Sequence, residues 1–323
     1  MKKISTSIII IIILIFIGSQ ILIRSSNILT SVAFSFDIWK NNIFPSLFPF
    51  FVLSELLINY GFVELLSEIF KPLMNLLFKT RGVCSFIFIM SIISGMPSNA
   101  KYIKELYQNN LIDEKEGTKL LMFTHFSNPL FILGTVSILF LNNKNVGILI
   151  LFCHYIANII IGIIFRNYYP TKENNTKINF QKAILAMHNK RISNNKSFGN
   201  ILTNSLINTI NTLLLILGVI TFFLVITTII NCNINLSLYR QSILNGIFEI
   251  TQGLKSISNL PISLKIKTTI CTMIISFGGL SGHMQIMSIL GDTKIKYLPF
   301  LFARIIHALI SGTLVYFLFN IFY

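Results

Sequence analysis

Long apolar runs recur along the chain and are separated by short polar segments. A helix crosses a bilayer with ~20 apolar residues, and several of these runs approach or exceed that length. We therefore expect membrane-spanning helices over residues 8–23, 43–58, 117–141, 145–165, 206–230 and 297–321. The pattern predicts an all-α polytopic membrane protein.

Two further segments carry apolar residues at helical spacing. In residues 62–79, which are too charged to span, the stripe is Phe62, Leu66, Ile69, Leu73 and Leu76. In residues 242–257 it is Ile243, Ile247, Ile250, Leu254 and Ile257. Each stripe predicts an amphipathic helix on or near the membrane interface.

Two apolar runs are broken by Gly, Ser and Pro and then resume with polar residues: "ISGMPSNAK" (residues 93–101) and "ISFGGLSGHMQ" (residues 275–285). We expect re-entrant helical hairpins, whose tips must be buried in protein or line a wet cavity. The resumed helices offer free N–H groups that favour anions. The candidate binding residues are Ser94, Gly95, Ser98 and Asn99 in the first tip and Gly278, Gly279, Ser281, His283 and Gln285 in the second. The alternative for each tip is an ordinary loop between short helices.

The amphipathic segments, the broken segments and the spans that follow them recur in the same order in both halves. If the broken segments are re-entrant, the first unit begins outside the membrane and the second begins inside. Inverted repeats with broken helices are typical of secondary transporters, which bind substrate between the halves. The fold expected is therefore an inverted repeat of two units, each with a re-entrant hairpin and an interfacial helix.

Charge supports an orientation. The 323 residues are 53% apolar and 11% charged, with mean hydropathy +0.73 and net charge +15. Much of the excess lies in the Asn-rich residues 166–200, which we interpret as a mobile cytoplasmic loop rather than as a nucleic-acid site. Lys2 and Lys3 place the N-terminus inside, as an uncleaved signal anchor. Against this topology, six basic residues would face outside: Arg240, Lys255, Lys265, Lys267, Lys294 and Lys296.

These assignments divide the chain into four parts. Residues 1–42 form the signal anchor and a connector, 43–165 the first repeat with a linking span, 166–200 the basic loop, and 201–323 the second repeat. The four cysteines are isolated, and the sequence contains no metal-ligand spacing, phosphate-binding loop or nucleophile–base pair. We therefore expect no metal, no cofactor and no enzymatic activity.

Polar residues inside the other spans extend the candidate site. Arg304 and His307 share a helix face, and an arginine within a span is usually functional. The alternative is that Arg304 reaches the interface with its long side chain. Asn128 lies at an interruption of the 117–141 span, with helix packing as the alternative, and Glu249 lies off the apolar stripe of its helix, where a solvated face is the alternative.

Five motifs in order resemble the YlbJ family of sporulation integral membrane proteins: "LFPFFVLSELL", "GMPSNAK", "NPLFILGTV", "GIFEITQGL" and "SFGGLSGHMQ". The resemblance runs from about Phe44 to the C-terminus. It implies nucleoside-recognition gate domains and transport of dipicolinate, a small aromatic dicarboxylate, from the mother cell across the outer forespore membrane. The family often reads "SGYP" and "GAK" where this chain has Met96 and "SNAK".

Three functions stay open on the sequence. The first is a carrier of dipicolinate, and the second is a carrier of a nucleoside-like molecule. The third is a scaffold that recruits other sporulation membrane proteins through residues 166–200. A multi-pass protein of the bacterial cell membrane or the outer forespore membrane, in contact with the lipid bilayer, is expected in each case. For the first function the expected partner is a small anionic substrate.

Overall fold

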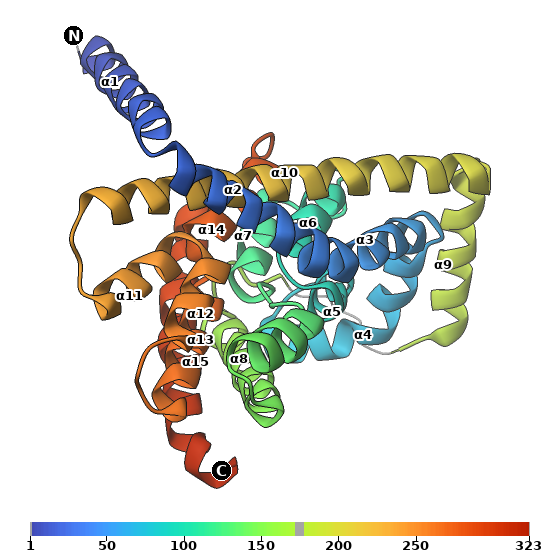
Figure 1. The fold of residues 1–323 in the computed structure, drawn as a ribbon. Helices are drawn as coiled ribbons and strands as arrows, with labels where there is room; N and C mark the ends of the chain where they lie inside the picture. Colours follow the sequence, from blue (N-terminus) through green and yellow to red (C-terminus); the bar gives the residue numbers. More distant parts are fainter. Residues whose placement is uncertain (1, 172–177, 323) are drawn as a thin grey trace.

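The computed structural model describes residues 2–171 and 178–322. Within these residues every regular element is a helix (Figure 1). Those of the first half are α1 (Lys2–Ile23), α2 (Ser25–Ile38), η1 (Trp39–Ile43), α3 (Phe44–Asn59), α4 (Phe62–Phe78), α5 (Cys84–Ser94), α6 (Ser98–Gln108), α7 (Glu114–Phe123), η2 (Phe131–Phe140) and α8 (Lys144–Ile164). Those of the second half are α9 (Phe180–Ser193), α10 (Phe198–Asn233), α11 (Leu238–Phe248), α12 (Ile250–Ser258), α13 (Leu264–Phe277), α14 (Gly279–Leu290) and α15 (Tyr297–Phe322).

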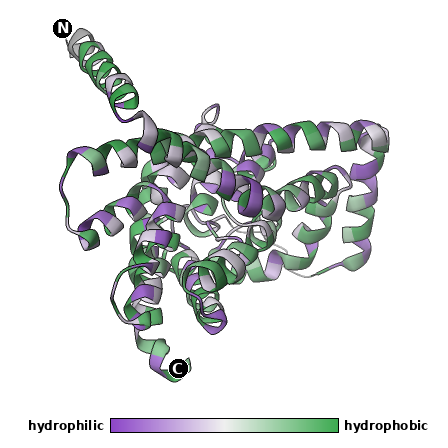
Figure 2. Cartoon of the chain, viewed as in Figure 1, coloured by the Kyte–Doolittle hydropathy of each residue, from purple (hydrophilic) through white to green (hydrophobic). Residues whose placement is uncertain are grey.

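Hydropathy predicts the long helices well. Six helical segments of the described residues are long and apolar enough to cross a membrane, and α1, α8, α10 and α15 contain or match the predicted spans. Most residues of these helices are hydrophobic (Figure 2), and many of their large apolar side chains are exposed, as expected for contact with lipid. The all-α, multi-pass membrane architecture is confirmed.

The helix that contains the predicted 43–58 span begins earlier than expected, because residues 25–59 form one continuous helical segment. Serines lower the hydropathy of its first part, but they bond to another helix. Ser31 and Ser35 lie within 2.6 Å and 2.8 Å of the hydroxyls of Thr228 and Thr221 on α10. Such hydroxyl pairs join helices in a membrane, so α2 and α3 run across α10 as a pair (Figure 1).

The predicted helix over residues 242–257 is wrong. The chain instead forms two short helices, α11 and α12, that fold back on each other around Glu249. The arms touch at two glycines, since a Cβ on Gly253 would lie 2.1 Å from the Cα of Gly246. The side-chain amide of Asn245 also donates to the hydroxyl of Ser256 at 3.2 Å, across the two arms. Close backbone contact therefore prevents a single straight helix.

The break at Gly278 is a different feature from the one at Gly95. α13 and α14 do not pack on each other as α5 and α6 do; they are successive parts of one interrupted segment, residues 264–290. The described elements therefore repeat an order that the sequence analysis did not anticipate. A hairpin, an interrupted helix and a continuous helix occur as α5–α6, α7–η2 and α8, and again as α11–α12, α13–α14 and α15.

The segment expected to be a mobile loop contains an ordered helix, α9. It packs along α4: the carbonyl oxygen of Met187 occupies the space next to Gly61, and the Arg191 guanidinium lies 4.6 Å from the ring centre of Tyr60. Three charged residues of this segment, Lys172, Glu173 and Lys177, lie outside the described residues. α9 therefore joins α8 to α10 by crossing one side of the molecule (Figure 1).

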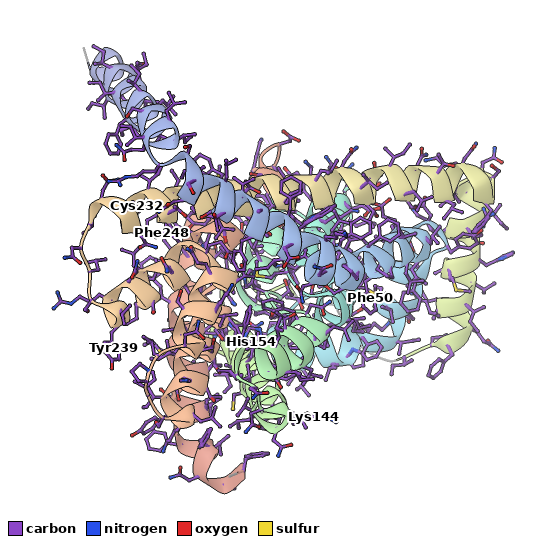
Figure 3. All side chains as sticks on the ribbon, in the orientation of Figure 1. Phe50, Lys144, His154, Cys232, Tyr239 and Phe248 are labelled. Atoms are coloured by element: carbon purple, nitrogen blue, oxygen red, sulfur yellow. The ribbon has the colours of Figure 1, made fainter. Side chains whose placement is uncertain are left out.

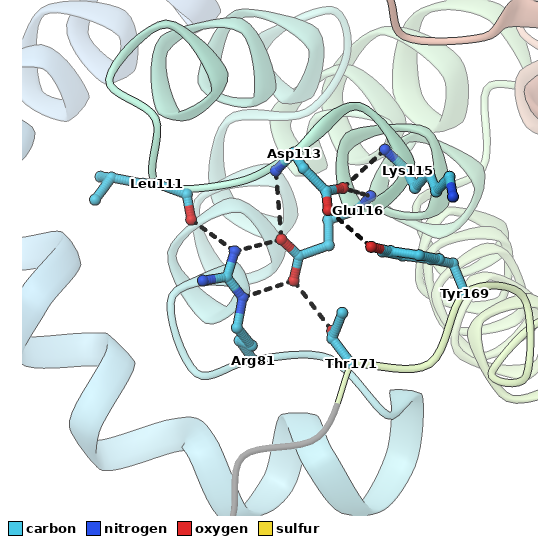
Figure 4. A network of polar contacts seen from close by, with 7 residues as sticks. All are labelled: Arg81, Leu111, Asp113, Lys115, Glu116, Tyr169 and Thr171. Atoms are coloured by element: carbon cyan, nitrogen blue, oxygen red, sulfur yellow. Dashed lines mark hydrogen bonds and ion pairs between the residues drawn. The ribbon is translucent and has the colours of Figure 1, made fainter.

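An ion pair between the partly exposed Arg81 and the buried Glu116 fixes the start of α7 (Figure 4). The Arg81 guanidinium binds both carboxylate oxygens of Glu116, which is 1% exposed, and donates to the carbonyl of Leu111 at 2.8 Å. The Asp113 carboxylate caps α7 by accepting from the backbone N–H of Lys115 and of Glu116. The Glu116 carboxylate holds the pKa of Arg81 above its usual value. The network holds the α6–α7 turn against the end of α4.

Candidate functional site

The first hairpin tip is joined to the interruption of α7–η2. Gly95 has φ +77°, and a Cβ there would lie 2.3 Å from the backbone nitrogen of Asn128, so only glycine fits. The Met96 N–H donates to the Phe126 carbonyl at 2.6 Å, and the Asn128 amide donates to the Ser94 carbonyl at 3.0 Å. The predicted interruption at residues 127–129 is present and begins slightly earlier, at Thr124. Asn128 is its last residue.

Asn128 also begins the helix that follows. Its side-chain oxygen accepts hydrogen bonds from the backbone N–H of Leu130 at 2.8 Å and of Phe131 at 3.3 Å. This is the geometry of an N-cap, which satisfies otherwise unpaired donors. One amide therefore holds the first tip through its nitrogen and the resumed helix through its oxygen.

The second hairpin tip is Glu249. Its backbone is extended, with φ −140° and ψ 124°, and its side chain caps α12 by accepting from the Gln252 N–H at 2.8 Å. The Thr251 hydroxyl donates to the same carboxylate. Glu249 is 2% exposed, so the solvated face offered as the alternative for this residue is excluded.

A cavity of about 80 Å³ lies where both tips and both interruptions meet. One side carries hydroxyl, amide and carboxyl groups, and the other is apolar and comes mainly from η1, α3 and α10. The described residues that line it are Ile43, Ser46, Leu47, Met96, Pro97, Ser127, Asn128, Phe131, Ile216, Ile220, Glu249, Ile250, Thr251, Ser281 and Gln285. A water molecule needs about 10–15 Å³ by this kind of measure, so the cavity has room for several.

The structure thus brings four predicted residues together in the cavity: Asn128, Glu249, Ser281 and Gln285. The sequence reasoning missed its apolar wall, because nothing in residues 43–47 or 216–220 distinguishes these positions from lipid-facing ones. Thr251, which lies off the same apolar stripe as Glu249 in the sequence, also lines the cavity. The glycines on either side of Glu249 were an available signal, since Gly246 and Gly253 allow two helix backbones to touch.

Three predicted residues of the first tip, Ser94, Ser98 and Asn99, are not among the described residues that line the cavity. The hydroxyls of Ser94 and Ser98 are 2.6 Å apart, and that of Ser94 is 3.0 Å from the hydroxyl of Tyr102, so these groups bond within the hairpin. Asn99 is fully buried, and neither polar atom of its side chain has a partner among the described residues. Its amide keeps its full capacity to bond a water or a ligand.

Arg304 is fully buried and is not among the described residues that line the cavity. Its guanidinium donates to the carbonyls of Met122 and His125, to the Asn158 side-chain oxygen at 3.1 Å and to Nδ1 of His307 at 2.7 Å. Carbonyls at the end of a helix lack intrahelical partners. Arg304 therefore caps the interrupted end of α7, and its fully buried side chain does not reach the interface.

The buried histidines are positioned by their hydrogen bonds. His307 accepts from Arg304 at Nδ1 and donates from Nε2 to the carbonyl of His154 at 2.9 Å. His154, on α8 (Figure 3), accepts at Nε2 from the N–H of Ser127 at 2.9 Å. His283 lies between the Phe277 carbonyl and the Tyr297 hydroxyl, at 3.0 Å and 2.9 Å. Two of these rings bond directly to residues at the interruptions, His154 to Ser127 and His283 to Phe277.

The two interruptions meet where His125 lies against Gly278. Gly278 and Gly279 have φ +93° and +56°, and the space that a Cβ on Gly278 would fill is occupied by Nε2 of His125, at 2.7 Å. Both residues therefore shape the backbone and carry no side-chain chemistry of their own. Within the described residues, no group of three or more His, Cys, Asp or Glu side chains could hold a metal ion.

Comparison with known proteins agrees with this architecture. Residues 41–144, which include the first hairpin and the α7–η2 interruption, match the Gate family model, described as nucleoside recognition. No solved structure gives a significant match to the chain. The chain is 33% identical over 303 residues to the sporulation integral membrane protein YlbJ of Bacillus subtilis (strain 168), a match that covers 86% of this chain and 74% of the relative. At this identity and coverage, the chain belongs to the YlbJ family of sporulation integral membrane proteins.

Proposed function

We propose that the protein is a secondary carrier that moves dipicolinate across the outer forespore membrane of the sporulating cell, and that the cavity between the hairpin tips is its substrate site. The observation that carries the proposal is the convergence of two hairpin tips and two helix interruptions on one cavity. Broken helices meeting inside a membrane protein are typical of transport sites. The relative's role in sporulation supports the choice of substrate.

The walls of the cavity suit a planar ring with polar edges. Apolar side chains such as Leu47 and Ile216 can cover the faces of the ring, while Ser127, Ser281 and Gln285 can bond its edge. Pockets for small molecules combine an apolar lining with a few placed polar groups in this way. Dipicolinate, with two carboxylates beside a ring nitrogen, fits this description.

Glu249 restricts the charge of the substrate that the cavity can bind. It is a carboxylic acid, and among the described residues that line the cavity none is basic. A dianion and an ionised Glu249 would repel each other strongly in a site of low dielectric. Dipicolinate therefore binds together with a proton, carried by Glu249 or by the substrate, which makes the proposed carrier proton-coupled.

The same observation favours a second candidate. A neutral nucleoside would bind beside an ionised Glu249 without repulsion, and its hydroxyls could donate to the carboxylate. The match of residues 41–144 to a nucleoside-recognition family supports this alternative. The two candidates differ in the charge of the substrate, which is directly measurable.

The test uses the purified chain in proteoliposomes. Uptake of labelled dipicolinate should exceed that of control vesicles and should be inhibited by unlabelled dipicolinate but not by uridine or adenosine. Gln285→Ala should weaken apparent affinity by roughly 2- to 10-fold, as expected for a lost hydrogen bond of about 0.5–1.5 kcal/mol. Gln181→Ala, on the exposed face of α9, is the matched control.

Two results would contradict the proposal. Uptake of nucleosides without uptake of dipicolinate would favour the second candidate. A scaffold would be favoured if neither compound is taken up and if the dipicolinate content of spores depends on residues 178–200 and not on the cavity.

A further inference from the structure

A large polar hollow lies on one side of the inner cavity, between α3, α6, α9 and the beginning of α10. Its volume is about 880 Å³. Four lysines line it, Lys101, Lys104, Lys190 and Lys196, against two acidic residues, Glu55 and Glu105, and most other lining side chains are amides or hydroxyls. We call this hollow the vestibule. Its excess of positive charge attracts small anions.

The vestibule and the inner cavity are stacked along the same helices. On α3, Leu47 lines the cavity and Glu55 lines the vestibule, which is about 12 Å farther along at ~1.5 Å per residue. On α14, Gln285 lines the cavity and Ser288 the vestibule, about 4.5 Å apart. Pro97, just before α6, lines the cavity, and Lys101, four residues later on α6, lines the vestibule. α10 runs in the opposite sense, with lining residues between 201 and 215 along the vestibule and Ile216 and Ile220 along the cavity. The two spaces are therefore consecutive parts of one route.

Of the vestibule residues on α3 and α6, Glu55 and Lys101 are the nearest along each helix to the residues that line the cavity, and they form an ion pair. Lys101 of α6 bonds the carboxylate of Glu55 on α3, and their side chains are only 13% and 7% exposed. The Lys101 ammonium also lies 5.2 Å from the ring centre of Phe51, which is fully buried. The side-chain amide of Asn208 on α10 donates to Glu55 at 3.3 Å. One carboxylate thus joins α3 and α10 to the first hairpin.

The Glu55–Lys101 ion pair is better suited to a contact that breaks and re-forms than to one that holds the helices together permanently. Apolar residues of similar volume often replace a buried ion pair without loss of stability, so an ionic link is not required to hold these helices. A carboxylate arriving from the vestibule can take the place of Glu55 on Lys101, because it offers the same acceptor to the same cation. Glu55 would then turn toward Asn208 and the water of the vestibule.

We propose that the vestibule is a binding site for small dicarboxylates and that the Glu55–Lys101 pair is the gate between it and the inner cavity. The ligand's carboxylate displaces Glu55, releases α3 from α6 and opens the route to Gln285. The choice of dipicolinate as ligand rests on the proposed function; the position of the gate does not.

The gate is tested without any substrate. Gln285→Cys places a thiol in the inner cavity, in a background where the half-buried Cys232 is replaced by serine. The rate of its modification by a small anionic methanethiosulfonate is measured in detergent micelles, where both faces are accessible. We expect Glu55→Gln and Lys101→Gln each to raise this rate at least several-fold.

Two controls make the result specific. Lys104 of the vestibule pairs with Asp292 at 2.9 Å, and the Asp292 side chain is 82% exposed. Lys104→Gln therefore removes the same charge as Lys101→Gln without breaking the gate pair, and it should not raise the rate. The exchanged pair, Glu55→Lys with Lys101→Glu, should return the rate toward that of the parent. Equal acceleration in Lys104→Gln, or no acceleration in either gate variant at normal yield, overturns the gate.

The vestibule is tested with a second thiol, Asn204→Cys, and with two compounds of equal shape. Pyridine-2,6-dicarboxylate should protect this thiol from modification, and the neutral pyridine-2,6-dicarboxamide should not. Lys190→Gln should weaken the protection. Equal protection by both compounds overturns the assignment to dicarboxylates, whereas failure of dipicolinate uptake with the gate results intact would contradict only the proposed function.

Discussion

Arg304 shows how far one residue can be interpreted from sequence. An arginine within an apolar run indicates a special role, and this holds because the residue is fully buried. Its partners lie almost 180 residues earlier in the chain, at the carbonyls of Met122 and His125, and no local pattern points to them. Its position could be predicted as important, but its capping role required the fold.

The capping role of Arg304 predicts a loss of stability. Arg304→Gln should lower the melting temperature in detergent, since each hydrogen bond to a charged group contributes about 1.5–3 kcal/mol. Arg304→Lys should be intermediate, because one ammonium cannot reach all the acceptors that a guanidinium fork reaches. A variant with normal thermal stability and a raised KM would instead indicate direct contact with substrate.

Glu249 predicts how transport depends on pH. A dianion must bind with a proton, so dipicolinate uptake by the parent should rise as the external pH falls. Glu249→Gln is neutral at every pH and cannot repel the substrate, so its uptake should be independent of pH. The measurement is the initial rate of uptake in proteoliposomes at a series of external pH values. A parallel pH profile in parent and variant would show that Glu249 does not carry the proton.

At the scale of elements, hydropathy predicted the long helices because burial in lipid depends on composition. Hydropathy failed at residues 242–257, because the apolar stripe there fits one straight amphipathic helix as well as it fits the two short helices that form. The two arms meet instead through Gly246 and Gly253, and such close packing leaves little trace in periodicity. The first tip was easier to predict, because Gly95 and Pro97 interrupt an apolar run directly.

The second hairpin should be sensitive to a single methyl group. A Cβ on Gly253 would lie 2.1 Å from the Cα of Gly246, so Gly253→Ala should separate the arms and destabilise the fold by about 1–3 kcal/mol. Gly218→Ala, on α10, is the matched control, since nothing lies within 4 Å of a Cβ there. Melting temperatures of the two variants in detergent give the comparison. Equal stability would mean that the arms do not touch as described.

At the scale of the molecule, the two halves share an order of elements that places their breaks around one cavity. The sequence predicts two related halves, but with the broken segment at residues 93–101 matched to the one at residues 275–285. The structure instead gives Gly95 and Glu249 equivalent places at the tips of hairpins, and it gives Asn128 and Gly278 equivalent places in interrupted helices. The continuous helices α8 and α15 follow each set. The inverted orientation of the halves stays a prediction, because it depends on the membrane.

That orientation makes a final prediction about the two ends of α8. Asn145 lies at its beginning, next to Lys144 (Figure 3), and is exposed, whereas Asn189 is exposed on α9, beyond its end. If α8 crosses the bilayer and the basic segment is cytoplasmic, Asn189→Cys should react with an impermeant thiol reagent only after the cells are opened. Asn145→Cys should react in intact cells, in the background with Cys232 replaced by serine.

Labelling of both thiols from the same side would contradict a crossing by α8 and, with it, the inverted arrangement of the halves. Labelling from opposite sides but in the reverse sense would keep the inverted arrangement and place the vestibule, which α9 lines through Lys190, on the outer side.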